Sequence, residues 1–95
     1  MAGYVIIDVK ITDPERYQEY RTLAAATLEA YGGRYLARGG KAETLEGDWD
    51  TGRIVVLEFD SIERARAWWA SEEYSAPKAV RQSASVTRMI LVEGV

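Results

Sequence analysis

The stretch YVIIDVKITDPE, residues 4 to 15, joins a β-strand directly to the start of an α-helix. In its first eight residues, one set of alternate positions is wholly apolar and the other is apolar at one end and charged at the other, which is the two-residue period of a strand. Asp13 suits the N-cap of a helix, Pro14 its first position and Glu15 its positive end. The stretch therefore predicts a strand with one core face and one mixed face, followed by a helix.

The rest of the chain continues this succession of strands and helices. The helix runs to about Tyr31 and ends at Gly32 and Gly33. Gly39 and Gly40 interrupt the next strand, and we interpret the interruption as a β-bulge after which the strand resumes. The elements predicted after the first helix are strands at 34–38 and 42–46, a turn at 47–52, a strand at 53–59, a helix at 62–71 capped by Ser61, a helical piece at 72–82 that Pro77 kinks or restarts, and a strand at 87–93.

The predicted order, β-α-β-β-α-β, favours the α+β class and a ferredoxin-like sandwich, in which one four-stranded antiparallel sheet carries both helices on one face. With 95 residues the chain makes a single domain, 1–95. No helix covers the other face of the sheet, where we expect Tyr4, Ile6, Ile54 and Val56. A second copy packed face to face about a two-fold axis is the simplest cover, so we expect a homodimer.

Several motifs in a fixed order resemble a known bacterial family. They are GRYLARGG at 33–40, LEGDW at 45–49, VLEFDS at 56–61, SEEY at 71–74, Arg81 and the ending VEG at 92–94. Together they resemble, over essentially the whole chain, domain of unknown function 1330. The resemblance implies the dimeric α/β-barrel superfamily, which includes cofactor-independent monooxygenases, muconolactone isomerases and haem-dependent peroxidases. The family has no established activity, so the resemblance implies a fold and not a function.

Composition excludes several classes of function. The net charge is −3, acids and bases alternate, and no apolar run approaches the length of a bilayer span, so we expect neither nucleic acid nor a membrane as partner. The residues after Met1 lack the basic and apolar segments of a signal peptide, so we expect a cytoplasmic protein. The chain contains no Cys and no His, the usual ligands of zinc, haem and iron–sulfur clusters, and we expect no metal and no cofactor. It also departs from the family pattern at Glu72, where proline is common.

The tripeptide Arg38-Gly39-Gly40 is the most distinctive local motif. An arginine offers a planar pair of donors to a carboxylate, and glycines let backbone amides approach a ligand closely, so the motif indicates an anion-binding site. Alternatively, the glycines form a bulge that bends the strand, and Arg38 pairs with an acid within the sheet or the dimer.

Glu58 and Asp8 are the candidate catalytic residues. Glu58 points to the open face from a strand that we expect to be central, and Asp8 comes from the neighbouring strand. A desolvated carboxylate among apolar neighbours serves as a general acid or base, and two close carboxylates separate each other's titrations. Alternatively, Glu58 forms a structural ion pair with Arg38 or Arg34.

The aromatic residues suggest a cavity wall. Trp68 and Trp69 are adjacent on a helix, so one packs on the sheet and the other reaches an interface or a cavity mouth. Trp69, Tyr74 and Arg81 are therefore candidate ligand-binding residues, together with the Arg38 motif.

Three functional hypotheses remain open at this point. The chain is a cofactor-independent enzyme, monooxygenase- or isomerase-like, that transfers protons on a small organic acid or aromatic substrate. Alternatively, it binds a small ligand without catalysis, or it is a purely structural homodimer.

Overall fold

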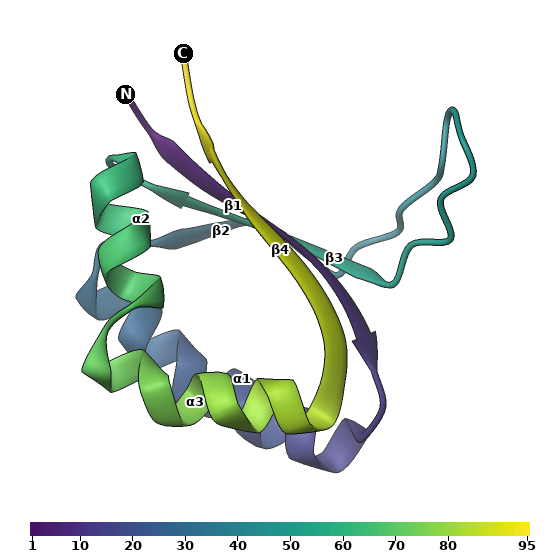
Figure 1. Ribbon diagram of the computed structural model, residues 1–95, viewed down its shortest axis with the longest axis horizontal. Helices are drawn as coiled ribbons and strands as arrows, with labels where there is room; N and C mark the ends of the chain where they lie inside the picture. Colours follow the sequence, from purple (N-terminus) through teal and green to yellow (C-terminus); the bar gives the residue numbers. More distant parts are fainter.

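The computed structural model describes all 95 residues, and its elements follow the predicted order (Figure 1). A single sheet lies on one side of three helices, and the two ends of the chain lie close together, where the Gly94 amide donates to the Ala2 carbonyl. The elements are β1 (Gly3–Ile11), α1 (Pro14–Ala30), β2 (Arg34–Arg38), β3 (Arg53–Phe59), α2 (Ile62–Trp69), α3 (Glu72–Ala84) and β4 (Ser85–Glu93).

The four strands form one antiparallel sheet in the order β2-β3-β1-β4. Val5 of β1 lies between Leu57 of β3 and Leu91 of β4, and this register sends alternate residues of the three strands toward the helices. The fold class predicted from the sequence, a ferredoxin-like α+β sandwich, is confirmed.

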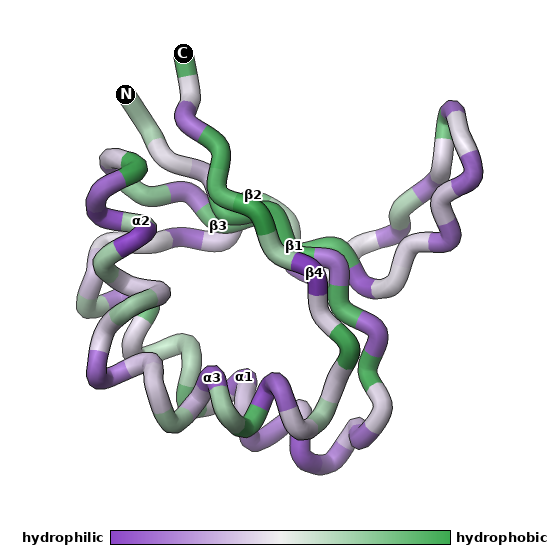
Figure 2. Tube along the Cα trace, in the orientation of Figure 1, coloured by the Kyte–Doolittle hydropathy of each residue, from purple (hydrophilic) through white to green (hydrophobic).

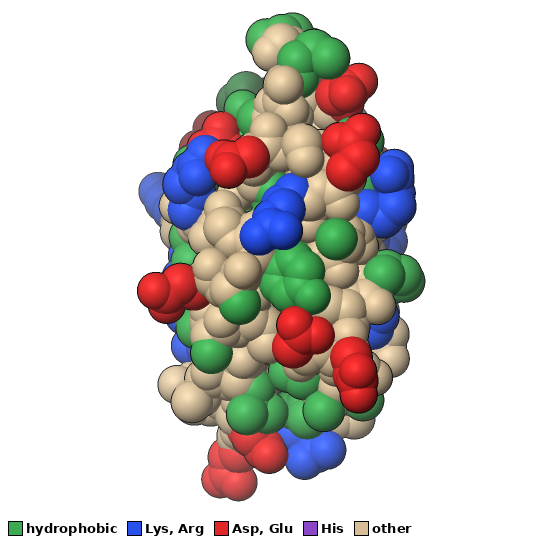
Figure 3. Space-filling model, turned by 90° about the vertical axis from the view of Figure 1, so that its left-hand side faces the viewer, with side chains coloured by type: hydrophobic (Ala, Val, Ile, Leu, Met, Phe, Trp, Pro, Cys, Tyr) green, Lys and Arg blue, Asp and Glu red, His purple; other side chains and the backbone are tan.

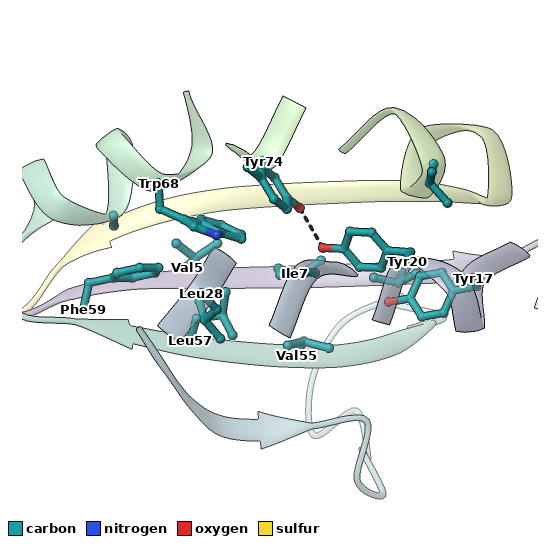
Figure 4. Packing of buried hydrophobic residues seen from close by; sticks show 14 of the residues in the cluster. Val5, Ile7, Tyr17, Tyr20, Leu28, Val55, Leu57, Phe59, Trp68 and Tyr74 are labelled. Carbon is teal, nitrogen blue, oxygen red and sulfur yellow. Dashed lines mark hydrogen bonds between the residues drawn. The ribbon is translucent and has the colours of Figure 1, made fainter. Parts of the chain in front are cut away.

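The hydrophobic core fills the space between the sheet and the helices (Figure 4). Trp68 of α2 lies between Phe59 of β3 and Tyr74 of α3, with ring centroids 5.5 and 4.2 Å away. The tube is apolar where the strands run side by side and mostly polar along the helices and the long loop (Figure 2). The large aromatic side chains therefore fix the distance between the two layers.

Each helix begins at a side-chain cap. Asp13 accepts a hydrogen bond from the Arg16 amide, Ser61 from the Arg64 amide, and Ser71 from the Tyr74 amide. The predicted restart at Pro77 is wrong, because the helix that starts at Glu72 continues through this proline to Ala84. The break in helical structure lies earlier, at Ala70 and Ser71, between α2 and α3.

The predicted bulge at Gly39–Gly40 and the strand at 42–46 are also wrong. The register of β2 against β3 shifts between Tyr35 and Ala37, and residues 39–52 form a loop that projects from the body of the molecule (Figure 1). The physical reason is the lack of a partner: Arg38 already pairs with Val55, and β3 begins at Arg53. Leu45 in this loop is 87% exposed.

The second face of the sheet carries no helix. Ile6 of β1 lies between Val56 of β3 and Ile90 of β4 on this open face.

Viewed from the side of α2, the surface mixes acidic and basic side chains without a patch of one sign (Figure 3). No helix in the structure combines the length and the apolar character that crossing a membrane requires.

Candidate functional site

Glu58 lies on the open face of the sheet, opposite Tyr4 of β1 and Arg34 of β2. Its Oε1 accepts a hydrogen bond from Arg34 Nε at 2.8 Å, so Arg34 is the partner among the two that the sequence left open. Glu58 also raises the pKa of the Tyr4 phenol, first through a hydrogen bond with that phenol and then through its negative charge. The expected meeting of Glu58 and Arg38 does not occur, because Arg38 pairs with Val55 and faces the helices.

Asp8 shares the open face with Glu58 but not the same space. It lies opposite Ile54, four residues along β1 from Tyr4, which separates the two carboxylates by about 13 Å along the strand direction. Asp8 accepts hydrogen bonds from Trp49 Nε1 at 3.0 Å and from the Gly52 amide at 2.8 Å. The Trp49 hydrogen bond is the main cause that holds the pKa of Asp8 below its ordinary value. Asp8 is thus an ionised anchor for the end of the long loop.

A small inner cavity lies between α1, α3 and the sheet. Its volume is about 30 Å³, and it is lined by four arginines together with apolar and aromatic side chains, but by no Asp or Glu. The arginines come from four different elements or their ends: Arg21, Arg38, Arg53 and Arg81. None of these four guanidinium groups forms an ion pair within the chain.

Arg81 is the most deeply buried of the four, with 5% of its surface exposed. Its Nε donates to the Tyr74 hydroxyl at 3.3 Å, and that hydroxyl lies 2.6 Å from the hydroxyl of Tyr20 (Figure 4). A guanidinium remains charged at all physiological pH values, and burying such a charge without an anion is unfavourable. The Arg81 charge is therefore desolvated without being neutralised.

The tyrosines around the cavity do not supply the missing negative charge. Burial raises the pKa of Tyr17, Tyr20 and Tyr35, although arginines lie close to each of them. These phenols consequently stay protonated and serve as hydrogen-bond donors or acceptors, so the cavity keeps its excess of positive charge.

Arg53 reaches the cavity because residue 39 is a glycine. Gly39 has a φ of +72°, and a Cβ at this position would collide with Arg53 Nε. Arg53 Nη2 donates to the Arg38 carbonyl at 3.1 Å, so its side chain lies along the backbone of the Arg38 motif. Gly40, by contrast, has open space around the position of a Cβ and lines neither the cavity nor a groove.

A larger groove opens between α2, α3 and β4. Its volume is about 490 Å³, and Arg81 lines both this groove and the inner cavity. Trp69, Met89 and Leu91 contribute apolar surface, and Arg66 contributes a second positive charge. No Asp or Glu lines the groove.

The structure thus brings some of the predicted site residues together and separates others. Arg38 and Arg81 line the cavity, Tyr74 accepts a hydrogen bond from Arg81, and Trp69 and Arg81 both line the groove. The remaining predicted residues lie elsewhere: Glu58 and Asp8 on the open face, and Gly39 and Gly40 in the loop that follows β2.

Sequence reasoning missed Arg21, Arg53 and Tyr20. Arg21 follows Tyr17 by four residues on α1, a spacing that places the two on one side of a helix. Arg53 lies two residues before Val55 on β3, and this two-residue spacing predicts the same face. Both signals were present, but long arginine side chains on a surface helix and at a strand end are usually solvated.

Residues 2–95 match the family described as a domain of unknown function, DUF1330. No curated protein is significantly similar to the chain in sequence.

Solved structures from several bacteria share the fold. A protein of unknown function from Rhodopseudomonas palustris matches with a TM-score of 0.79 at 18% identity, over 99% of this chain and 82% of that one. SnoaB, a cofactor-independent oxygenase from Streptomyces nogalater, matches with a TM-score of 0.66 at 12% identity, over 99% of this chain and 93% of that one. An EthD family protein from Bacillus halodurans matches with a TM-score of 0.62 at 11% identity, over 100% of this chain and 99% of that one. These neighbours are dimeric α/β-barrel proteins, and at such identities the likeness shows the fold alone.

Proposed function

Because the chain belongs to the DUF1330 family, whose description names no activity, we propose its function from the site: the protein binds a small organic acid at Arg81, between its helices and its sheet. The observation that carries this proposal is the burial of the Arg81 guanidinium without a carboxylate partner. A ligand carboxylate would neutralise this charge and form the short, charge-assisted hydrogen bonds that arginine favours.

The groove supports an organic acid rather than a simple salt ion. Its volume of about 490 Å³ falls in the range of about 300–1,000 Å³ that is typical of small-molecule sites. Trp69, Met89 and Leu91 offer contacts to an apolar or aromatic body, while Arg81 and Arg66 offer charge to an acidic group. A molecule with an apolar body and one carboxylate satisfies both parts of the lining.

Calorimetric titration tests the proposal directly. We expect hexanoate and benzoate to bind the wild-type protein, and their neutral amides to bind at least about tenfold more weakly, because one charge-assisted hydrogen bond contributes about 1.5–3 kcal/mol. Arg81→Met should lower the affinity for the acids to the affinity that the wild-type protein has for the amides. Arg16→Met is the matched control, because Arg16 is exposed and lines neither space. Equal binding of acid and amide, or unchanged binding by Arg81→Met, would refute the proposal.

Catalysis on the bound acid is a second candidate. The hydroxyl pair of Tyr20 and Tyr74 beside Arg81 favours it, because preorganised donors stabilise a developing enolate oxygen. Glu58 and Asp8 lie on the opposite face of the sheet, so water accepts the proton lost from the substrate carbon while the tyrosine hydroxyls stabilise the enolate oxygen. Exchange of the C3 hydrogen of phenylpyruvate for deuterium in D₂O, followed by NMR, measures such proton transfer. Exchange that Tyr74→Phe does not slow would exclude this role.

Self-association is the third part of the proposal. The open face presents Ile90, 58% exposed, in line with Ile6 and Val56, and the chain covers only the Asp8 end of this face, with Trp49 of the long loop. The structural neighbours belong to a fold class named for its dimers. We therefore propose a homodimer that buries the open face and leaves the cavity and most of the groove accessible, with Ile90 at the edge that the two surfaces share.

A further inference from the structure

The inner cavity carries more positive charge than one ligand carboxylate at Arg81 explains. Arg21, Arg38 and Arg53 also line it, and none of them has an anionic partner. In addition, Arg21 Nε is buried without any hydrogen-bond acceptor. Buried donors are almost always paired in native proteins, so an orphaned N–H on a cationic cavity wall indicates an acceptor that occupies the cavity.

The size of the cavity limits what this acceptor is. A volume of about 30 Å³ holds about two water molecules, since one needs roughly 10–15 Å³. This space accommodates an anion of only a few non-hydrogen atoms and no carbon chain. Guanidinium groups bind carboxylate and phosphate alike through two parallel hydrogen bonds, so the small volume of the cavity is what favours a small planar oxyanion over the bulkier phosphate.

We propose that the inner cavity is a second binding site, for a small planar oxyanion with the dimensions of formate, nitrate or hydrogen carbonate. Arg81 and Arg21 Nε hold this anion from the inside, and Arg38 at the end of β2 and Arg53 at the start of β3 close the site. The proposal does not depend on the organic acid in the groove, because Arg21, Arg38 and Arg53 do not line the groove.

Gly39 is a positioning residue for this anion site. Its lack of a side chain gives room to Arg53 Nε, which lies at the end of a flexible side chain and would swing away from a methyl group. Gly40 has no neighbour that a methyl group would meet. Gly47 shares the positive φ of Gly39, at +86°, and also has no neighbour that a methyl group would meet, so Gly47→Ala controls for backbone strain and Gly40→Ala for the added methyl group.

Titration with sodium formate at constant ionic strength, kept with sodium chloride, tests the site. We expect saturable binding by the wild-type protein and by Arg16→Met, measured by calorimetry and by the rise in melting temperature. Arg21→Met and Arg53→Met should each bind formate at least about tenfold more weakly, which corresponds to the loss of one charge-assisted hydrogen bond. Gly39→Ala should weaken formate binding as Arg53→Met does, whereas Gly40→Ala and Gly47→Ala should leave formate binding unchanged, with circular dichroism confirming that all three variants fold.

Three outcomes would overturn the inference. They are a melting temperature that rises with formate without saturation, equal formate affinity in the wild type and Arg21→Met, and binding of hexanoate but not of formate. The last outcome assigns the arginines to the carboxylate end of a larger acid. In contrast, a protein that binds formate but neither hexanoate nor benzoate has the small-anion site and lacks the proposed function. Failure of the small-anion site and failure of the proposed function therefore give different results.

Discussion

At the scale of single residues, Arg81 joins two properties that rarely occur together, deep burial and a permanent charge. Its only side-chain partner is the Tyr74 hydroxyl, which carries no charge. A buried ionised group loses its hydration, and a neutral hydroxyl replaces only part of it. The unliganded protein therefore bears a local cost in stability that an anionic ligand would remove.

This cost predicts that Arg81→Met stabilises the unliganded protein. Methionine has a similar length and an apolar end, and replacing even a paired buried charge together with its partner by apolar residues is often neutral or stabilising by about 1–4 kcal/mol in other proteins. We expect an increase in the free energy of unfolding of about 1 kcal/mol, equivalent to a melting temperature about 4–8 °C higher for a domain of this size. Urea denaturation without ligand measures it. A variant that is clearly less stable than the wild type would show that Arg81 is a structural residue.

Asp8 predicts a pH dependence of stability. Its pKa is depressed in the folded state, mainly by the hydrogen bond from Trp49, so its contribution is present above the unfolded value of about 3.9 and disappears as the pH falls through the folded pKa. Asp8→Asn should lower the free energy of unfolding by about 1–2 kcal/mol at neutral pH, because Asp8 accepts hydrogen bonds as a charged group. Below the folded pKa the two proteins should be equally stable.

The control for this prediction is Asp50→Asn, since the Asp50 side chain is 98% exposed. Urea denaturation at several pH values compares the three proteins. A difference between wild type and Asp8→Asn that stays constant from neutral to strongly acidic pH would contradict an ionised anchor.

Glu58→Gln separates the open face from the ligand site. Its partner Arg34 has a side chain that is 54% exposed, so the ion pair contributes at most about 1 kcal/mol. We expect a small loss of stability and unchanged binding of organic acids, because Glu58 lies on the far side of the sheet from Arg81. A catalytic role of Glu58 or Asp8 stays a prediction. Melting curves of the wild type and Glu58→Gln with and without benzoate test whether Glu58 belongs to the ligand site. Loss of benzoate binding in a stable Glu58→Gln protein would return Glu58 to that site.

At the scale of elements, strand periodicity was sufficient to place most side chains on the correct face. Alternation in β1 and β3 predicted that Tyr4, Ile6, Ile54 and Val56 share the open face, and the register confirms it. Two adjacent tryptophans on a helix predicted one buried and one exposed ring, and Trp68 is buried while Trp69 is exposed. Periods of this kind depend on local geometry alone, which the sequence contains.

The errors arose where an outcome depends on distant residues. The face on which Arg38 lies follows from the register shift between Tyr35 and Ala37, and no residue in β2 signals this shift. The predicted strand at 42–46 has suitable residues but no partner strand. The cluster of arginines likewise depends on three-dimensional packing, because Arg21 and Arg81 are brought together by the contact between α1 and α3.

The junction of α2 and α3 is the element that positions Tyr74 beside Arg81. Ser71 accepts a hydrogen bond from the Tyr74 amide at 3.1 Å and donates one to the Trp68 carbonyl at 2.7 Å. Ser71→Ala should lower the free energy of unfolding by about 1 kcal/mol through the loss of this cap. Ser75→Ala, at an exposed position inside α3, is the control. Thermal denaturation measures both, and equal stability of the two variants would show that the cap contributes nothing.

At the scale of the whole molecule, the sheet separates two surfaces with different chemistry. The helix side holds the arginine-lined cavity and the groove, and the open side holds an apolar row from β3 through β1 to β4. A ligand therefore approaches from one side and a second copy from the other. Ile90 of the edge strand β4 is the exception, because it belongs to the apolar row and also lines the groove.

Ile90→Asp is the sharpest test of self-association. Ile90 lies at the end of the row formed with Ile6 and Val56, and it is 58% exposed in the single chain, so a charge there costs the isolated protomer little. In a dimer of standard size, about 800 Å² on each protomer is buried, and an unpaired carboxylate inside such an interface is strongly unfavourable. Sedimentation equilibrium should give a dimer mass for the wild type and a monomer mass for Ile90→Asp, with an unchanged circular dichroism spectrum. Leu23→Asp alters an exposed leucine on α1 instead and should remain dimeric. A monomer mass for the wild type at micromolar concentration, or a dimer of Ile90→Asp, would show that the open face is not the interface.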